Sequence, residues 1–529
     1  MNILKSLFSS PPAPLSYMKL GPDGSKDNPL MIQFFTWESQ VTETSWWKHF
    51  ENEIPTLAEM GFTQVWLPPP NKAAHPEGRG YDAYDLWDLG EFDQKGSIAT
   101  RWGSKEEFLS ACRVAKEHQV DIIIDAVLNH KLGADRVEEV KVIPVDPQNR
   151  LKALGPRQEI EGWTIFDFPG RGNKYSSMRW NQEYFTGLDW DQKTQTKGVF
   201  KIVGKGHKGW SKNVDKELGN YDYLLGVDID HRHPEVQRDF FSWGSWIIET
   251  TGAVGFRLDA IKHIDRGFTL RFLQSTRKST NSRMFSVAEY WSGNINSVLP
   301  YTRAFKGETA FFDVPLHMNF HHASQHYSRY DLRTLMDNSL VKIKPGHAVT
   351  FVDNHDTVIP YISQNEASAD SFLLVQVEGQ SLESWVGDHF KIQAYAVILL
   401  RGTGYPCVFY GDLYPNTECF NENIARNLEL LVKARKLYAY GGTQDYPSTK
   451  NCIGFVRMGD STHSGCAVIL SNREDDYVHS IRMNVGRSHA ESTFQSYLTT
   501  DGRVEIDAEG WGEFTCFAGS AQVWVKLES

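Results

Sequence analysis

Long apolar runs, basic patches and paired cysteines are all missing from this sequence of 529 residues. No apolar segment is long enough to span a bilayer. The residues before Leu20 contain only short apolar pieces interrupted by Ser and Pro, which argues against a signal peptide. The formal net charge of −11, without a clustered basic surface, argues against nucleic-acid binding. We therefore expect no membrane or nucleic-acid partner.

The cysteines follow no metal-ligand or disulfide spacing, and several lie inside apolar runs, as buried free thiols do. They are Cys112, Cys407, Cys419, Cys452, Cys466 and Cys516. This usage favours a reduced, cytoplasmic protein, and we expect a monomer. With 40% apolar and 23% charged residues the chain is typical of a soluble globular protein, and its length favours two or three domains.

Strand-like and helix-like segments alternate along most of the chain, which predicts an α/β fold of the (β/α)8 TIM-barrel type. The expected strands are Leu30–Trp37, Gln64–Pro68, Val120–Leu128, Ala253–Leu258, Met284–Glu289, Ala310–Val314, Ala348–Val352 and Cys407–Tyr410. The expected helices are Ser45–Met60, Ser104–His118, Pro234–Thr250, Arg266–Lys278, Leu332–Leu340, His389–Arg401 and Asn423–Tyr438.

Two parts of the chain break this alternation. Residues 131–233 follow the third strand, are rich in Gly, Trp and Tyr, and lack a helical period, which predicts an inserted domain B. Residues 437–529 contain short alternating runs separated by turn residues, which predicts a C-terminal antiparallel β-sandwich. The barrel would then consist of residues 1–130 and 234–436.

Charged residues gather where the fourth expected strand ends. Arg257 and Asp259 are two positions apart, so their side chains point to the same face. The arginine is expected to lower the pKa of the aspartate and leave an anion that can act as a nucleophile. Lys262 and His263 add positive charge and donors close by. An ion pair that only closes the strand would give the same local pattern.

Three other expected strands also end in carboxylates or histidines, and strand ends of one kind meet at one face of a barrel. The segments are Asp125–His130, Ala288–Trp291 and Asp353–Asp356. Two carboxyl groups flanking a glycosidic bond are what retaining glycoside hydrolysis requires. Glu289 has apolar neighbours that would raise its pKa, as a general acid needs, and Asp356 could stabilise a cationic transition state.

The chain resembles the α-amylase family, glycoside hydrolase family 13, in four ordered segments. They are Asp125–His130, Gly255–His263, Val287–Trp291 and Phe351–Asp356. Three further segments are similar to the liquefying, bacterial-type subfamily: Phe168–Gly172, Gly219–Leu224 and Phe311–Leu316. The resemblance to the family extends to the late segment Gly510–Phe514. The resemblance covers nearly the whole chain and implies an intracellular enzyme for retaining endo-hydrolysis of α-1,4-glucosidic bonds in starch, glycogen or maltooligosaccharides.

The resemblance also implies roles for individual residues. Asp259 would be the nucleophile, Glu289 the acid/base and Asp356 the transition-state stabiliser. The residues implied to contact sugar are Trp37, Tyr84, His130, Arg257, Lys262, His263, Trp291 and His355. A 4-α-glucanotransferase is the nearest alternative, because a sugar hydroxyl can intercept the same covalent intermediate. A catalytically silent glucan-binding protein on this scaffold is another.

One structural Ca²⁺ is implied by the same resemblance, with Asn129, Asp222, Asp228 and the backbone carbonyl of His263 as ligands. Oxygen ligands of this kind suit Ca²⁺, although a solvated acidic loop would have the same composition. Where liquefying relatives add cation ligands, this chain has Thr186, Ser211 and Arg232, so we expect a single ion.

A second departure from the family pattern lies after Asp356, where Val358–Gln376 is inserted. This segment is either a lid over the cleft or a retained intron in the gene sequence.

Overall fold

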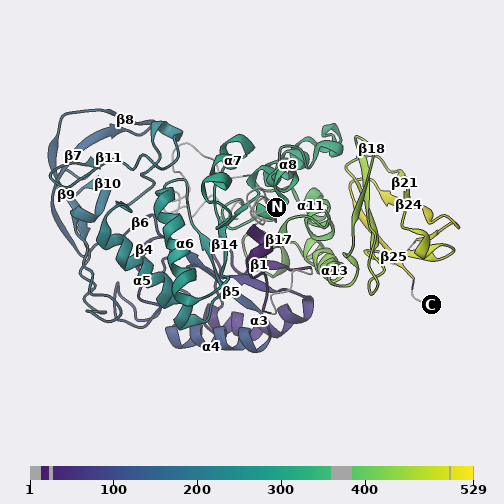
Figure 1. Cartoon of the computed structure of the whole chain (residues 1–529), viewed down its shortest axis with the longest axis horizontal. Coiled ribbons are helices and arrows are strands. Elements are labelled where there is room, and N and C mark those ends of the chain that lie inside the picture. The colour runs from purple at the N-terminus through teal and green to yellow at the C-terminus, as the bar shows by residue number, and fades with distance from the viewer. Residues whose placement is uncertain (1–13, 23–27, 359–383, 500–501, 528–529) are drawn as a thin grey trace, which may run out of the picture.

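The computed structural model describes residues 14–22, 28–358, 384–499 and 502–527. Its centre is a closed barrel of eight parallel strands in the order β1-β17-β16-β15-β14-β13-β5-β2 (Figure 1). The strands are β1 (Met31–Gln33), β2 (Gln64–Trp66), β5 (Asp121–Ala126), β13 (Gly255–Leu258), β14 (Phe285–Ala288), β15 (Ala310–Phe312), β16 (Ala348–Phe351) and β17 (Tyr405–Phe409). All eight predicted strands are confirmed.

These segments become strands because every residue in them is buried, as expected for parallel strands that are covered by helices outside and by side chains inside. Gly255, at the start of β13, shows how closely two strands approach. A β-carbon added there would lie 2.6 Å from the carbonyl oxygen of Phe285 in β14. The short distance between β13 and β14 brings the residues that follow them together.

Helices alternate with the barrel strands and surround them (Figure 1). They are α2 (Pro14–Tyr17), α3 (Trp46–Met60), α4 (Lys105–Glu117), α5 (Pro234–Thr251), α6 (Arg266–Thr280), α7 (Ile295–Ala304), α8 (Val314–His326), α9 (Leu340–Ile343), α11 (Asp388–Leu400), α12 (Tyr410–Leu413) and α13 (Glu422–Tyr438). Six of the seven predicted helices are confirmed. In α4 the Ser104 side chain and the Glu107 side chain each accept from the other residue's backbone N–H, which forms a capping box.

The predicted helix Leu332–Leu340 is wrong. Its residues form a single 3-10 turn, Leu332–Thr334, and the chain turns away at Asn338, whose φ of 54° is left-handed. The α8 helix, which the sequence did not predict, occupies this part of the barrel wall instead. Asp313 is its N-cap, and the Asp313 side chain accepts from the backbone N–H of Leu316.

The segment after the third barrel strand forms a separate antiparallel sheet at one end of the molecule (Figure 1). Its strands are β6 (His130–Lys131), β7 (Arg136–Asp146), β8 (Asn149–Ala153), β9 (Gln158–Ile165), β10 (Phe185–Asp191), β11 (Thr196–Ile202) and β12 (Val227–Ile229). A small hairpin, β3 (Lys72–Ala73) with β4 (Ala83–Asp85), follows β2. Since β6 pairs with β12, the sheet begins and ends beside the barrel.

The C-terminal part of the chain packs a six-stranded antiparallel sheet against a two-stranded one, at the opposite end from the inserted sheet (Figure 1). The first sheet contains β18 (Thr443–Thr449), β19 (Cys452–Arg457), β20 (Cys466–Ser471), β25 (Ala521–Lys526), β22 (Thr493–Ser496) and β23 (Arg503–Glu505). The second contains β21 (Val478–Asn484) and β24 (Trp511–Phe517). Their facing side chains, among them Val456, Met483 and Phe514, form a separate apolar core.

Within the described residues, no helix has both the length and the apolar character needed to cross a membrane. All six cysteines are free thiols. Apart from Val358, the inserted segment Val358–Gln376 lies outside the described residues.

Candidate active site

Arg257 connects the acidic residues at the carboxyl end of the barrel. Its Nη1 donates to Asp125 Oδ1 at 2.9 Å and to Asp259 Oδ1 at 2.6 Å, and its Nη2 donates to Glu289 Oε2 at 2.8 Å. The Arg257 side chain is 1% exposed. One buried guanidinium therefore holds three carboxyl groups from three neighbouring strands.

The strand register explains this meeting. In the barrel, Arg257 of β13 lies beside Asp125 of β5 and Val287 of β14. Asp259 and Glu289 are the first residues beyond β13 and β14, so both side chains emerge at the same rim. The backbone N–H of Ala260 also donates to Glu289 Oε2 at 3.0 Å. The predicted proximity of Asp259 and Glu289 follows from the pairing of their strands.

Asp356 reaches the same group from the other side of the barrel, after β16. Its Oδ2 lies 3.4 Å from His355 Nε2, and its side chain is 21% exposed. The charges of Glu289, Arg257 and Asp259 all influence its ionisation. The three residues predicted to be catalytic therefore share one electrostatic environment.

Burial raises the pKa of all three carboxyl groups, while Arg257 lowers it. The pKa of Asp259 rises to about 6, that of Glu289 rises above its usual value, and that of Asp356 rises well above it. The prediction of a lowered pKa for Asp259 is thus wrong in its net direction, because burial outweighs the attraction to Arg257. One cation facing several carboxyl groups favours a retained proton, which acid catalysis needs.

Three parallel aromatic rings border the acidic residues. Tyr81 and His355 have ring centroids 5.2 Å apart and planes within 11° of parallel, and Trp37 stacks on both at 5.9 Å. The Tyr81 hydroxyl donates to Asp125 Oδ2 at 2.7 Å, and Gln33 Nε2 lies 3.0 Å from His355 Nδ1. Trp37 and His355, both predicted from the sequence as sugar contacts, therefore lie in one aromatic group, and Tyr81, which the sequence analysis missed, lies with them.

Tyr84 does not belong to this aromatic group, which corrects the sequence-based assignment. Its side chain is fully buried, its hydroxyl donates to Asp135 at 2.8 Å, and its ring packs on Phe168. A ring without an exposed face cannot stack on a sugar. Tyr81 lies three residues earlier in the same irregular loop and takes the position expected for Tyr84.

The other predicted sugar contacts lie around the same rim. His130 Nε2 is 2.8 Å from the carbonyl oxygen of Tyr81. Lys262 Nζ donates to the carbonyl oxygen of Trp291 at 3.0 Å and to Glu217 at 2.6 Å. Trp291 is partly exposed, whereas Lys262 and His130 are buried.

The residues predicted to bind calcium meet where the inserted sheet joins the barrel. In the pairing of β12 with β6, Asp228 lies opposite His130, the neighbour of Asn129. Burial and the nearby charge of Asp222 raise the pKa of Asp228. Asn129 Oδ1 and Asp228 Oδ1 are buried without a hydrogen-bond partner. His263 Nδ1 lies 2.7 Å from the carbonyl oxygen of Tyr221, next to Asp222. Two orphaned oxygens beside a buried carboxylate fit a hard cation.

The histidine, cysteine and carboxylate side chains of the described residues form no group of three that could hold a metal ion. A cation here would depend on amide and backbone oxygens as well. Arg232 fills the adjacent space: its Nε donates to Asp230 Oδ1 at 2.7 Å, and Nη1 donates to the carbonyl oxygen of Trp210 at 3.2 Å. This guanidinium lowers the pKa of Asp222, although burial raises it overall to about 7.

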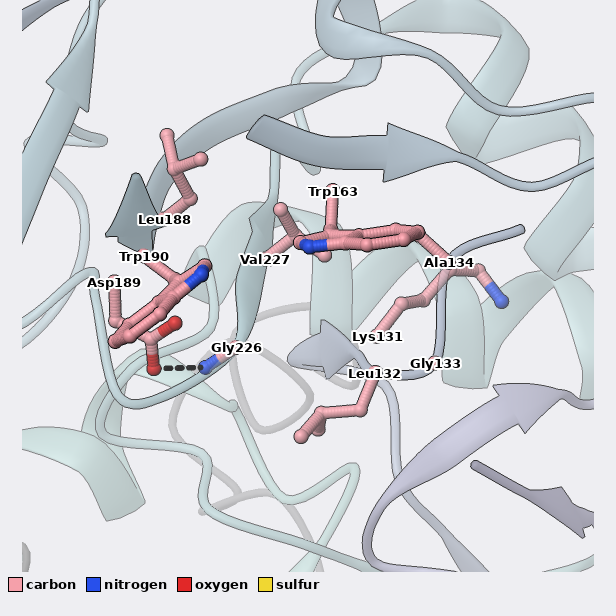
Figure 2. A pocket seen from close by; sticks show the side chains of 10 residues that line it. All are labelled: Lys131, Leu132, Gly133, Ala134, Trp163, Leu188, Asp189, Trp190, Gly226 and Val227. Atoms are coloured by element: carbon pink, nitrogen blue, oxygen red, sulfur yellow. Dashed lines mark hydrogen bonds between the residues drawn. The ribbon is translucent and has the colours of Figure 1, made fainter. Parts of the chain in front are cut away.

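A pocket of about 360 Å³ lies on the inserted sheet, lined by residues of β6, β9, β10 and β12 and of the loops beside them (Figure 2). Its walls include Trp163, which is 40% exposed, and Trp190. Both indole N–H groups donate to Gln192 Oε1 at 3.0 Å, which holds the two rings together. Lys131, which follows His130, lines the same pocket. The sequence did not indicate this site, because its two tryptophans come from different strands of the sheet.

Comparison with known proteins gives consistent matches. The family described as "Alpha amylase, catalytic domain" matches residues 47–429. The chain is 41% identical to an α-amylase of Geobacillus stearothermophilus over 507 residues, which cover 95% of this chain and 88% of that protein. It is 37% identical to the cytoplasmic α-amylase of Escherichia coli (strain K12), with 95% and 99% of the two chains covered.

Solved structures match in fold. The α-amylase I of Eisenia fetida aligns with a TM-score of 0.61 at 14% identity, covering 94% of this chain and 97% of that one. The α-amylase of Geobacillus thermoleovorans in complex with acarbose aligns with a TM-score of 0.59 at 17% identity, covering 95% and 98%.

Proposed function

Because the chain belongs to the α-amylase family, we propose that the acidic group at the barrel rim hydrolyses internal α-1,4-glucosidic bonds of starch, glycogen or maltooligosaccharides with retention of configuration. The observation that carries the proposal is the sharing of one buried guanidinium by Asp259 and Glu289. Reducing-sugar release from soluble starch, with the anomeric form of the first products followed by NMR, tests it.

The mechanism needs one ionised and one protonated carboxyl group. Asp259 Oδ attacks the anomeric carbon while Glu289 gives its proton to the departing glycosidic oxygen, and a glycosyl ester on Asp259 results. Glu289, now ionised, takes a proton from water, whose oxygen attacks the anomeric carbon and releases Asp259. Asp356 would stabilise the positive charge that develops on the sugar ring.

Transfer to a sugar hydroxyl would use the same intermediate, but relatives described as α-amylases do not favour it. The intact trio argues against a silent binding protein. We further infer a cytoplasmic site of action, supported by the E. coli relative and its description, and a monomer in solution.

The pocket lined by Trp163 and Trp190 is proposed to extend the glucan cleft, because exposed indole faces can stack on sugar rings. A Trp163→Ala variant should raise KM for maltoheptaose about tenfold, as expected for losing one buried ring contact. KM for maltotriose, too short to span both sites, should stay within about twofold. Leu154→Ala, at an exposed apolar residue directly after β8, is the control. Equal increases in KM for both substrates would show that the pocket is not part of the glucan cleft.

One Ca²⁺ is proposed at Asn129, Asp222, Asp228 and the carbonyl oxygen of His263, where it would fasten the inserted sheet to the barrel beside Asp259. Chelation should lower the melting temperature, since an ion at about a thousand times its Kd stabilises by about 4 kcal/mol. Asp228→Asn should lose this response. Asp191→Asn, at a buried carboxylate already satisfied by Thr194 and backbone N–H groups, should keep it. Two or more tightly held ions per chain by elemental analysis would contradict a single site.

A further inference from the structure

The turn that carries Asp356 rests on a buried chain of polar side chains that the proposed mechanism does not use. We propose that Thr357, Asp353 and Lys391 form a brace that positions Asp356 for the reaction. The inference rests on the proposed function of Asp356, and it assigns positioning roles to residues that do not touch the sugar.

The upper half of the brace closes the turn on itself. Thr357 Oγ1 donates to Asp353 Oδ1 at 2.8 Å and accepts from the backbone N–H of Asn354 at 3.1 Å. Asn354 Oδ1 in turn accepts from the backbone N–H of Asp356 at 2.8 Å and of Thr357 at 3.1 Å. The backbone of the turn around Asp356 is therefore held by the side chains of Asn354 and Thr357.

The lower half fastens the turn to the helices beneath it. Lys391 of α11 lies 3.3 Å from Asp353 Oδ2 and is bonded to Asp412 of α12, which also accepts from the Tyr395 hydroxyl at 2.6 Å. The backbone N–H of Val386 donates to Asp353 Oδ1 at 3.2 Å. The side chains of Asp353 and Asp412 are 0% exposed and that of Lys391 is 3% exposed.

The position of Asp356 depends on this arrangement, because its own carboxylate has few constraints. It is 21% exposed, and its ion contact is with the neighbouring His355 at 3.4 Å. Burying the Asp353–Lys391–Asp412 group costs desolvation that apolar side chains would avoid. Apolar side chains could not provide the directional bonds that connect Lys391 of α11 to Asp353 and, through Asp353, to Thr357 at the other end of the turn.

Thr357→Val tests the brace, because valine fills the same space without the hydroxyl. We expect kcat on starch to fall about ten- to hundredfold, since a misplacement of about 1 Å can cost about a hundredfold, with KM within about twofold. Thr357→Ser keeps the hydroxyl and should restore kcat to within about threefold of the original. Thr350→Val is the matched control, because the buried Thr350 hydroxyl of β16 has no hydrogen-bond partner; its kcat should be unchanged.

A kcat for Thr357→Val equal to that of Thr350→Val overturns the brace. A rise in KM with unchanged kcat in Thr357→Val also overturns it. The same holds if Thr357→Ser does not restore kcat although Thr357→Ser and Thr357→Val melt at the same temperature. Should Thr357→Val not fold, Lys391→Met and Thr357→Ser carry the test: the inference requires a lowered kcat in the first at temperatures where it remains folded. Asp356→Asn tests the proposed role of Asp356 separately from the brace, since full activity in that variant would contradict that role.

Discussion

A Glu289→Gln variant is expected to fold normally and to lose kcat by about 10²–10⁴-fold, the usual contribution of a general acid. Glutamine has nearly the same shape and can still accept from Arg257 and from the backbone N–H of Ala260. What it lacks is the proton for the departing oxygen. Initial rates on soluble starch, with circular dichroism as a check on folding, give the measurement.

The pH profile makes this test specific to the acid role. Because burial raises the pKa of Glu289, the original protein should lose activity at alkaline pH as Glu289 gives up its proton, and at acidic pH as Asp259 becomes protonated. The two limbs belong to the coupled pair of carboxyl groups. The alkaline limb should disappear from the residual activity of Glu289→Gln. A variant with unchanged turnover, or with the full bell-shaped profile, would contradict the assignment.

The barrel could be predicted from the sequence because its strands are short buried runs bounded by helices, a pattern visible without tertiary information. The meeting of Asp259 with Glu289 then follows from barrel geometry. The choice between Tyr81 and Tyr84 could not be made in this way. They lie three residues apart in a loop of irregular backbone, and only the packing decides which ring faces the acidic residues.

Two further sequence-based predictions, a lowered pKa for Asp259 and a helix at Leu332–Leu340, are wrong for the same reason. In both, an effect of the folded structure outweighs the local one. The charge of Arg257 lowers the pKa of Asp259 as expected, but the extent of burial, which decides the net direction, is a property of the folded chain. The Leu332–Leu340 segment has helical apolar spacing, yet Asp331 and Asn338 bend it into short turns. Nothing in the sequence indicated that the Gln192 side chain accepts hydrogen bonds from both Trp163 and Trp190.

Arg257→Met is expected to be the most damaging single change for stability. Removing the guanidinium leaves Asp125, Asp259 and Glu289 buried without their cation, and loss of one partner from a buried ion pair typically costs about 3–5 kcal/mol. Arg171→Met is a matched control, because the Arg171–Asp85 pair is equally buried at 2.7 Å but involves one carboxylate away from the barrel rim. It should also lose stability while its folded form retains activity.

The pH dependence of stability tests whether the buried carboxyl groups depend on Arg257. A carboxyl group whose pKa is raised by folding stabilises the protein fully below its unfolded value of about 3.9 and loses that contribution as pH rises through the folded value. For Asp259 the folded pKa is already about 6 with Arg257 present, and removing the cation should raise it further. Arg257→Met should therefore be most stable near pH 4 and become steadily less stable toward pH 8. Urea denaturation at several pH values measures this slope, and a stability of Arg257→Met that is flat or rises with pH would show that the buried carboxyl groups do not depend on Arg257.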